Sequence, residues 1–142
     1  MKIVREILAK KGSSIYSLSP DDTVYEALVQ MAEKNVGALL VLENGQLAGI
    51  LSERDYARKV ILTGKSSRET TVREIMTTRV LIVDDKTNAE ECMSLMINKH
   101  IRHLPVVTDG VLQGIISIGD AVKAVIEDKQ DTISELERYI AG

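Results

Sequence analysis

The sequence predicts a mixed α/β fold of the α+β class, in which two β-α-β-β-α repeats pack sheet to sheet around a pseudo-two-fold axis. An internal repeat is the first reason: shifting the chain by 65 residues aligns residues 15–61 with residues 80–126 without a gap and with 13 identities. Hydrophobic periodicity is the second reason, because both copies show strand and helix patterns in the same order. One copy of about 60 residues is marginally stable alone, so we expect the two copies to share a core.

Each copy is expected to begin with a short strand, at residues 15–18 and 80–83, and to continue with a helix. Apolar residues at the i, i+3, i+4, i+7 and i+8 spacing of one helical face indicate this helix. They are Val24, Ala27, Leu28, Met31 and Ala32 in the first copy and Ala89, Cys92, Met93, Met96 and Ile97 in the second. The candidate N-caps are Asp22 or Thr23 and Thr87 or Asn88, with Glu26 and with Glu90 or Glu91 placed for capping boxes.

A hairpin and a second helix complete each copy. The dipeptides Asn44-Gly45 and Asp109-Gly110 each lie between two apolar runs. Both dipeptides tolerate the positive φ angles of a two-residue hairpin turn, so they predict a tight turn between two antiparallel strands. The helix that follows is expected over residues 53–63 in the first copy and residues 118–128 in the second.

The predicted organisation is a first repeat at residues 4–64, a second repeat at residues 72–128 and a C-terminal helix at residues 129–142. The first repeat includes an N-terminal helix, whose "VREIL" matches the "VREIM" that precedes the second copy. That match has an offset of 68 residues, so the first copy carries three extra residues near Ser13.

The C-terminal helix has an apolar stripe made of Ile133, Leu136 and Ile140. Such a stripe must be covered to leave water, either by the protein's own core or by another chain. The sequence leaves both interpretations open: together with the N-terminal helix the tail caps the core, or it forms a dimer contact.

Composition excludes several classes of function. A net charge of −3 and a pI near 5.4 argue against general nucleic-acid binding, which needs a basic face. Cys92 is the only cysteine and lies at an apolar helical position, so we expect a buried thiol. His100 and His103 have no further ligand at a familiar spacing, so no metal site is expected. The N-terminus lacks the pattern of a signal peptide and no apolar run approaches the ~18 residues of a membrane span, so a cytoplasmic protein is expected.

Two heptads carry the candidate site: "GILSERD" at residues 49–55 and "GIISIGD" at residues 114–120. Both have the frame Gly-apolar-apolar-Ser-x-x-Asp. One interpretation is local, because serine followed three residues later by an acid is the pattern of a helix capping box. The other is a nucleotide site, in which free N–H groups and the serine hydroxyl bind phosphate and the aspartate binds the ribose hydroxyls. The glycine would let a ligand or a neighbouring backbone approach.

A basic pair strengthens the nucleotide interpretation in the second copy. The stretch "IRHLPV" places Arg102 and His103 at the start of the predicted middle strand, and arginine is a natural planar partner for phosphate. Pro105 cannot donate to a strand ladder and therefore indicates a strand edge or opening. The first copy has glycine and alanine in place of the basic pair, but carries Arg54, Arg58 and Lys59 beside or after its own heptad.

These features resemble a tandem pair of cystathionine-β-synthase (CBS) domains, also called a Bateman module, of the stand-alone bacterial or archaeal kind. The β-α-β-β-α order found twice, "IRHLPVV", the two heptads and "VREIM" carry the resemblance, which covers about residues 4–128. No single heptad is specific, whereas their repetition at a fixed spacing is.

The resemblance implies a non-catalytic regulatory module that binds adenosine nucleotides in clefts between the repeats and forms a disc-like homodimer. AMP is the first candidate ligand, and NAD(H), ATP and S-adenosylmethionine are also used in the family. The residues implied to bind the ribose are Asp55 and Asp120, those for the phosphate are Ser52 and Ser117, and those that add charge at the second site are Arg102 and His103. The segment 77–80, with Thr78 and Val80, and Pro105 would flank the adenine at the second site, and residues around Ile15 would do so at the first. The first site would borrow Arg54 or Arg58 for phosphate, or bind more weakly.

The sequence offers three alternatives to this sensor function. An enzyme is not expected, because the sequence has no nucleophile–base pair, no metal-ligand set and no P-loop. The alternative to nucleotide sensing is a structural homodimerisation module whose Ser-x-x-Asp units are only helix caps. Nucleic-acid binding is disfavoured by charge and by the lack of aromatic residues for stacking. The effector protein that would read a ligand signal is unknown from the sequence.

Overall fold

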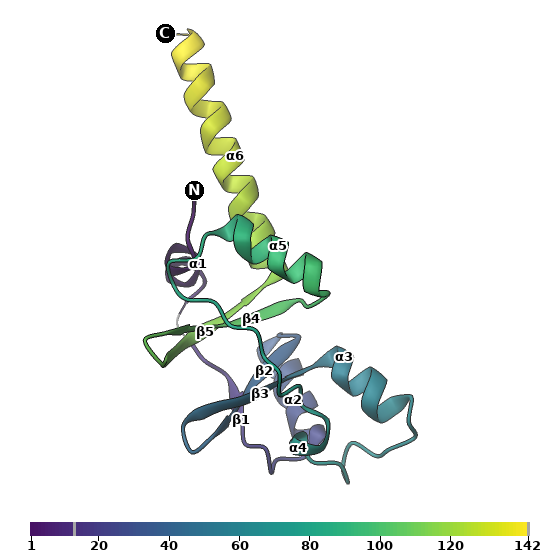
Figure 1. Cartoon of the computed structure of the whole chain (residues 1–142). Helices are drawn as coiled ribbons and strands as arrows, with labels where there is room; N and C mark the ends of the chain where they lie inside the picture. The colour runs from purple at the N-terminus through teal and green to yellow at the C-terminus, as the bar shows by residue number, and fades with distance from the viewer. Residues whose placement is uncertain (13, 142) are drawn as a thin grey trace. The chain divides into compact units, whose positions relative to one another are not determined.

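The structure is a computed structural model that describes residues 1–12 and 14–141; Ser13 and Gly142, which fall within the predicted first repeat and C-terminal helix, lie outside the described residues. The chain forms two compact units (Figure 1). We call residues 15–80 the first-repeat unit, and residues 1–14 together with 81–142 the second-repeat unit. Both contain short strands and helices, so the predicted mixed α/β class is confirmed.

The first-repeat unit is built on a three-stranded sheet in the order β1-β2-β3. Strand β1 runs parallel to β2, and β2 and β3 form an antiparallel hairpin. Its elements are β1 (Ser17–Leu18), α2 (Val24–Lys34), β2 (Ala38–Glu43), β3 (Gln46–Ser52), α3 (Glu53–Tyr56), the π-helical turn η1 (Ala57–Ile61) and α4 (Val72–Ile75). Its aliphatic core consists of Leu18, Val24, Ala27, Met31, Leu39, Val41, Leu51, Val60, Val72 and Ile75.

The second-repeat unit has an antiparallel pair of strands, β4 and β5, and three helices. Its elements are α1 (Val4–Lys11), α5 (Ala89–Lys99), β4 (His103–Thr108), β5 (Val111–Ser117) and α6 (Ile118–Ala141). Its core consists of Val4, Ile7, Val83, Ala89, Cys92, Met96, Leu104, Val106, Ile116, Ala121 and Ala124. Cys92 is fully buried, and burial of its thiol, followed by the charges of Glu91 and Asp84, raises its pKa to about 11.

Turn and cap chemistry fixes the ends of these elements locally. Both predicted hairpins form, with φ of 53° and 77° at Asn44-Gly45 and of 52° and 77° at Asp109-Gly110. Of the candidate caps, Thr23 begins α2, since its hydroxyl accepts a hydrogen bond from the Glu26 N–H at 3.1 Å. Asn88 begins α5 in the same way, accepting from the Glu91 N–H at 2.9 Å.

The helices α1 and α4 both begin with Val-Arg-Glu-Ile. Helix α1 docks on the second repeat, and helix α4 docks on the first repeat. The Val4 N–H donates to the Thr87 carbonyl at 2.8 Å, so α1 belongs to the second-repeat unit. The Val72 N–H donates to the Asp22 carbonyl at 2.8 Å, so α4 belongs to the first-repeat unit. Both copies of the sequence motif therefore have the same role. Each helix packs against the repeat that does not directly follow it in the sequence.

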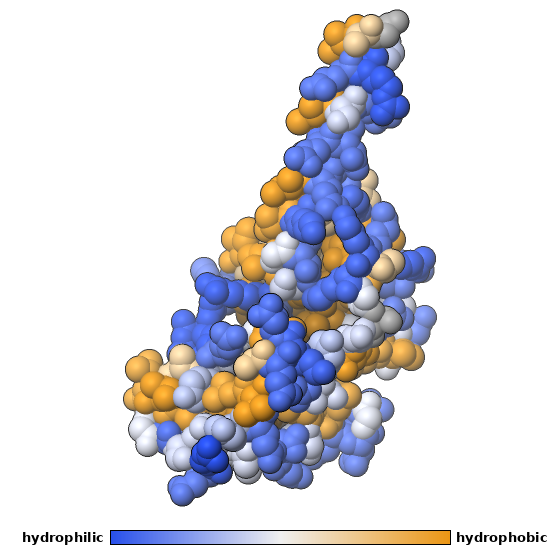
Figure 2. Space-filling view, turned by 180° about the vertical axis from the view of Figure 1, so that it is seen from behind, coloured by the Kyte–Doolittle hydropathy of each residue, from blue (hydrophilic) through white to orange (hydrophobic). Residues whose placement is uncertain are grey.

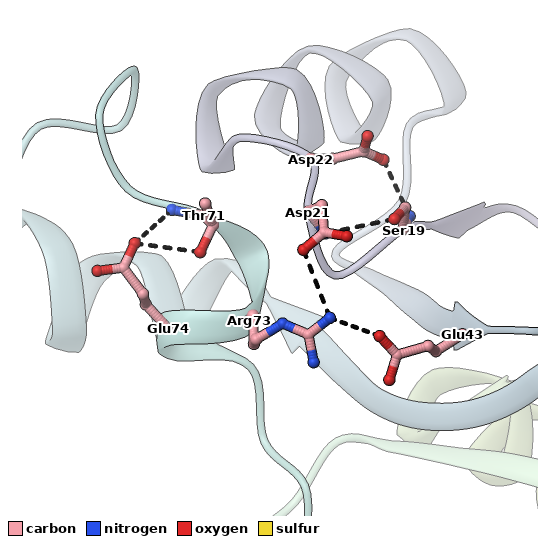
Figure 3. Close-up of polar contacts among 7 residues, drawn as sticks. All are labelled: Ser19, Asp21, Asp22, Glu43, Thr71, Arg73 and Glu74. Atoms are coloured by element: carbon pink, nitrogen blue, oxygen red, sulfur yellow. Dashed lines mark hydrogen bonds and ion pairs between the residues drawn. The ribbon is translucent and has the colours of Figure 1, made fainter.

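The arginine of each motif adds an ion pair to this docking. Arg5 Nε lies 3.0 Å from Asp85 Oδ2, and this hydrogen bond lowers the pKa of the Asp85 carboxyl although burial opposes the shift. Figure 3 shows the equivalent Arg73 of α4 between the carboxylates of Asp21 and Glu43. The distance from Arg73 Nη2 to Asp21 Oδ1 is 3.4 Å. Both arginines thus tie a short helix to acids of the repeat on which it docks.

Three predicted elements differ from the structure. The strand expected at residues 80–83 is reduced to one parallel bridge between Val83 and Val106. The helix expected over residues 53–63 divides into α3 and the π-helical turn η1. The helices expected at residues 118–128 and 129–141 are continuous in α6, because no glycine or proline interrupts the chain between them.

The end of α6 does not cap the core. Ile133, Leu136 and Ile140 are 54%, 56% and 82% exposed, and the last turns of α6 extend beyond α1 and α5 of the same unit (Figure 1). The capping interpretation of this stripe is therefore wrong for the tail, whereas α1 does cover the core with Val4 and Ile7. Among the described residues, no helix has the length and apolar character needed to cross a membrane.

Candidate functional site

Both Ser-x-x-Asp units lie where a strand passes directly into a helix. In the second repeat, the Asp120 N–H donates to Ser117 Oγ at 3.1 Å and the Ser117 N–H donates to Asp120 Oδ2 at 2.8 Å. The corresponding distances between Asp55 and Ser52 are 3.2 Å and 3.0 Å. Each serine and aspartate therefore forms a reciprocal capping box, as the local interpretation of the heptads predicts.

In the second repeat, Asp120 has a partner far away in the sequence. Lys11, the last residue of α1, places its Nζ 2.7 Å from Asp120 Oδ2 and 3.0 Å from the carbonyl oxygen of Ile115. Burial, the largest single influence on Asp120, would raise its pKa, but the hydrogen bonds from Lys11 and Ser117 together lower it. Asp120 is therefore ionised at neutral pH and can act only as an acceptor.

In the first repeat, Asp55 is surrounded by more donors. Its Oδ2 accepts from the N–H and the hydroxyl of Ser52, and its Oδ1 lies 3.2 Å from Thr77 Oγ1 and 3.1 Å from Lys59 Nζ. Lys59 also donates to the Ile75 carbonyl at 2.9 Å. The side chain of Asp55 is 12% exposed and that of Asp120 is 25% exposed, so the second carboxylate is the more accessible of the two.

Gly49 allows the close approach of backbone that brings Thr77 to Asp55. Residues Ile50 and Thr77 form an antiparallel bridge with hydrogen bonds of 3.0 Å and 2.9 Å. A Cβ atom on Gly49 would lie 2.7 Å from the Thr77 carbonyl oxygen. The neighbour that needs this glycine is thus a backbone segment, one of the two possibilities that the sequence left open.

The basic pair of the second repeat lies beside its Ser-x-x-Asp turn. His103 is opposite Ser117 in the β4–β5 register, and the Ile118 N–H donates to the Arg102 carbonyl at 2.8 Å. Arg102 is an exposed residue at the beginning of α6, where the positive end of the helix dipole favours an anion. Pro105 is buried within β4, and its carbonyl accepts from Val83, so its ring nitrogen lies on the edge of β4 away from β5.

The other predicted residues group with the first repeat. Arg54 and Arg58 lie on α3 and η1, the first half-buried and the second exposed. Thr78 and Val80 follow Thr77 in the first-repeat unit, where the Val80 N–H donates to the Thr78 carbonyl at 3.1 Å. The bridge between Ile50 and Thr77 brings the start of the segment 77–80 close to Asp55 within the first-repeat unit.

Sequence reasoning did not identify Lys11, Thr77 or Lys59 as partners of the two aspartates. Lys59 has the i, i+4 spacing from Asp55 that places two residues on one helical face, so its role was visible in the sequence. Lys11 is separated from Asp120 by 109 residues, and no local pattern connects them.

A hollow of about 290 Å³ opens between α1 and α6 beside the Lys11–Asp120 pair. This volume is at the lower end of the ~300–1,000 Å³ range of small-molecule sites. The hollow is lined by Lys2, Glu6, Ile7, Lys10, Lys11, Asp120, Lys123, Ala124 and Glu127. Asp120 is thus the only predicted site residue that lines it.

Comparison with known proteins identifies the family of this chain. A family model described as the CBS domain matches residues 4–62 and 72–127, which is most of the chain. The chain belongs to the CBS domain family. It is a tandem CBS pair, a regulatory module, and its fold is the fold of solved CBS pairs.

This CBS pair is similar to one curated relative and to two solved structures, the second of which shares the fold. The mitochondrial CBS domain-containing protein CBSX3 of Arabidopsis thaliana is 40% identical over 98% of this chain and 72% of its own. A solved structure of a protein with CBS domains from Burkholderia ambifaria is 49% identical, with a TM-score of 0.86 over 89% of this chain and 96% of its own. The CBS domain pair of protein MJ0100, solved with 5′-methylthioadenosine and S-adenosyl-L-methionine, has a TM-score of 0.77 at 23% identity, over 91% of this chain and 98% of its own.

Proposed function

We propose that this CBS pair is a non-catalytic sensor of an adenosine nucleotide, which binds at the Ser117–Asp120 turn of the second repeat. The observation that carries the proposal is which oxygen of the Asp120 carboxylate accepts hydrogen bonds. Ser117 N–H and Lys11 Nζ both donate to Oδ2, and neither contact uses Oδ1. A ribose diol can bind a carboxylate with one hydroxyl on each oxygen, and within the part of the chain that the structure describes no hydrogen bond engages Oδ1 of Asp120.

The first repeat is less suited to the same ligand. Four donors from Ser52, Thr77 and Lys59 already engage both oxygens of Asp55. A ribose there would have to displace at least two of them. We therefore propose that the Asp120 site binds more tightly than the Asp55 site.

The surroundings of Asp120 favour a nucleotide with a phosphate next to the ribose. Arg102 and His103 belong to the strand start that pairs with Ser117 and with the first peptide of α6. Arginine together with a helix N-terminus provides charge and N–H donors for phosphate. AMP is therefore the first candidate, with NAD(H), ATP and S-adenosylmethionine as the other ligands to test. The complex of MJ0100 with adenosine compounds supports the choice of an adenosine ligand, because that pair has the same fold.

A second candidate function is structural homodimerisation through the end of α6. The exposed stripe of Ile133, Leu136 and Ile140 favours it, and Figure 2 shows apolar side chains spaced along this projecting helix between hydrophilic ones. Dimerisation and sensing are compatible, so the question is whether a nucleotide binds at all. If no nucleotide binds, the Ser-x-x-Asp turns are helix caps only.

Thermal unfolding with AMP, ATP, NAD(H) and S-adenosylmethionine tests the proposal. A ligand at about 100 times its Kd stabilises the folded state by ~2.7 kcal/mol. We expect AMP to raise the Tm of the wild-type chain and of Asp55→Ala, and not that of Asp120→Ala. Loss of the cap lowers the Tm of either variant without ligand, so only the ligand-dependent shift is compared. The sensor proposal is wrong if no nucleotide at millimolar concentration shifts the Tm of the wild type.

A further inference from the structure

The Lys11–Asp120 ion pair occupies the group to which the proposed ribose binds. Lys11 Nζ is 2.7 Å from Asp120 Oδ2, and the Ser117 N–H occupies the same oxygen at 2.8 Å. A carboxylate oxygen has two lone-pair positions, so these two donors fill Oδ2. A ribose that binds side by side, with one hydroxyl on Oδ1 and the other on Oδ2, must therefore displace one of these two donors. The Ser117 N–H is fixed in the backbone, whereas the lysine side chain can rotate away.

The lysine is attached to a different part of the fold from the aspartate. Lys11 is the last residue of α1, and Gly12 follows it with φ 103°, its N–H donating to the Leu8 carbonyl at 2.9 Å. Asp120 lies in the first turn of α6. The ion pair, together with the bond from Lys11 to the Ile115 carbonyl, therefore fastens the end of α1 to the turn between β5 and α6.

In the first repeat the distant partner of the aspartate is a hydroxyl: Thr77 Oγ1, 22 residues away, lies 3.2 Å from Asp55 Oδ1, and the lysine is local. This lysine, Lys59, lies four residues after Asp55 and on the same helical segment. Release of Lys59 from Asp55 would leave Lys59 its bond to the Ile75 carbonyl and Asp55 its bond to Thr77. Release of Lys11 from Asp120 would loosen a contact between two elements that are 109 residues apart. The two repeats thus differ in what ligand binding would change.

We infer that Lys11 competes with the nucleotide for the Asp120 carboxylate. Lys11 pairs with Asp120 until the ribose of the nucleotide displaces it. Binding of the nucleotide thereby frees the end of α1. This inference rests on the proposed function, since it requires a ribose at Asp120. Lys11 is then a determinant of nucleotide affinity at the second site. The end of α1 is the element that changes when the nucleotide occupies this site. Residues around α1 then carry the signal that an effector protein would read.

Titration calorimetry with adenosine tests the inference, because adenosine has the ribose but no phosphate to attract Lys11. The titrations use the full chain with Asp55→Asn to silence the first site, alone and combined with Lys11→Met or Lys10→Met. Lys10→Met is the matched control: Lys10 is the neighbouring residue, lines the same hollow, and pairs with Glu127 at 2.9 Å instead of with Asp120. Circular dichroism confirms that each variant is folded before titration.

We expect Lys11→Met to tighten adenosine binding about two- to fivefold, the range of a partly exposed ion pair, and Lys10→Met to leave it unchanged. We also expect saturating adenosine to speed hydrogen exchange of the Gly12 amide in the Asp55→Asn chain that keeps Lys11. Unchanged or weaker binding by Lys11→Met, with clear binding by the parent chain, overturns the competition and leaves the proposed function standing. Absence of adenosine and AMP binding by every chain, including the wild type, overturns both.

Discussion

The substitution Gly49→Ala tests whether the Thr77 backbone lies against β3 as described. The new Cβ would lie 2.7 Å from the Thr77 carbonyl oxygen and 3.1 Å from the sulfur of Met76. Ordinary van der Waals contact begins at 3.4 Å, so the carbonyl must move by 3.4 − 2.7 = 0.7 Å. The sulfur belongs to a flexible side chain and can give way more easily than the backbone.

The magnitude follows from what holds the carbonyl in place. Both hydrogen bonds of the bridge between Ile50 and Thr77, of 3.0 Å and 2.9 Å, must stretch if the Thr77 peptide moves. Forcing an extra methyl group into such a contact typically costs about 1–3 kcal/mol. Replacing glycine by alanine returns roughly 0.4–1 kcal/mol through the lower entropy of the unfolded chain. We therefore expect a net loss of about 1–2 kcal/mol in the free energy of unfolding.

Thermal unfolding followed by circular dichroism measures this loss. For a chain near 150 residues, 1 kcal/mol corresponds to a shift in Tm of about 2–4 °C, so we expect Gly49→Ala to lower the Tm by roughly 2–8 °C. Gly119→Ala is the control, because its Cβ would meet only the Ser117 hydroxyl, at the ordinary distance of 3.6 Å. This variant should keep or raise the wild-type Tm.

The outcome that refutes the reasoning is a Gly49→Ala chain that melts at or above the wild-type temperature. In that case the Thr77 backbone does not lie against Gly49, and the contact between Thr77 and Asp55 loses its support. An equal loss in Gly119→Ala would also refute it, because the effect would then come from glycine replacement in general.

Three further predictions concern single side chains. Cys92, whose burial raises its pKa to about 11, should not react with a thiol reagent at pH 8 until denaturant is added; rapid reaction of the folded chain would contradict this. The hydrogen bond from Lys2, and then that from Lys10, lower the Glu127 pKa from 4.5 to about 2, so its stabilisation is complete above pH 4.5 and is lost as the pH falls towards 2. Tm measurements across that range should therefore show a shallower acid loss in Glu127→Gln than in the wild type, and equal slopes would count against the ion pairs. Thr23→Ala should lose about 1 kcal/mol with its N-cap, measured by urea unfolding, whereas Thr132→Ala within exposed α6 should lose nothing comparable.

Much of this protein was readable from the sequence because the deciding interactions are local. The cap of α2 joins Thr23 to a residue three positions away, and the hairpin turns depend on two adjacent residues each. The Ser-x-x-Asp turns are also local, and their capping geometry needs only a strand followed by a helix. Shifting the chain against itself found the two copies without any knowledge of their packing.

The predictions that differ from the structure depend on contacts between distant residues. The strand at residues 80–83 is shortened because only Val83 reaches a partner in β4. The sequence pattern of the apolar stripe at the end of α6 is the same for a covered and for an exposed stripe. Only the fold shows that Ile133 and Leu136 are exposed to solvent. Burial is a property of what surrounds a residue, and the sequence around a residue does not specify it.

The sequence by itself determined the duplication, the order of the elements in each copy and the placement of a serine and an aspartate at two strand-to-helix turns, since these depend on patterns within a few residues. Only the tertiary structure decided that α1 docks on the second repeat and α4 on the first, and hence that Lys11 meets Asp120 and Thr77 meets Asp55. The physical reason is that these pairs form when a helix buries its apolar face against a repeat distant in the sequence. The difference between the two carboxylates arises from that docking, because α1 brings Lys11 to Asp120, whereas the segment that follows α4 brings Thr77 to Asp55.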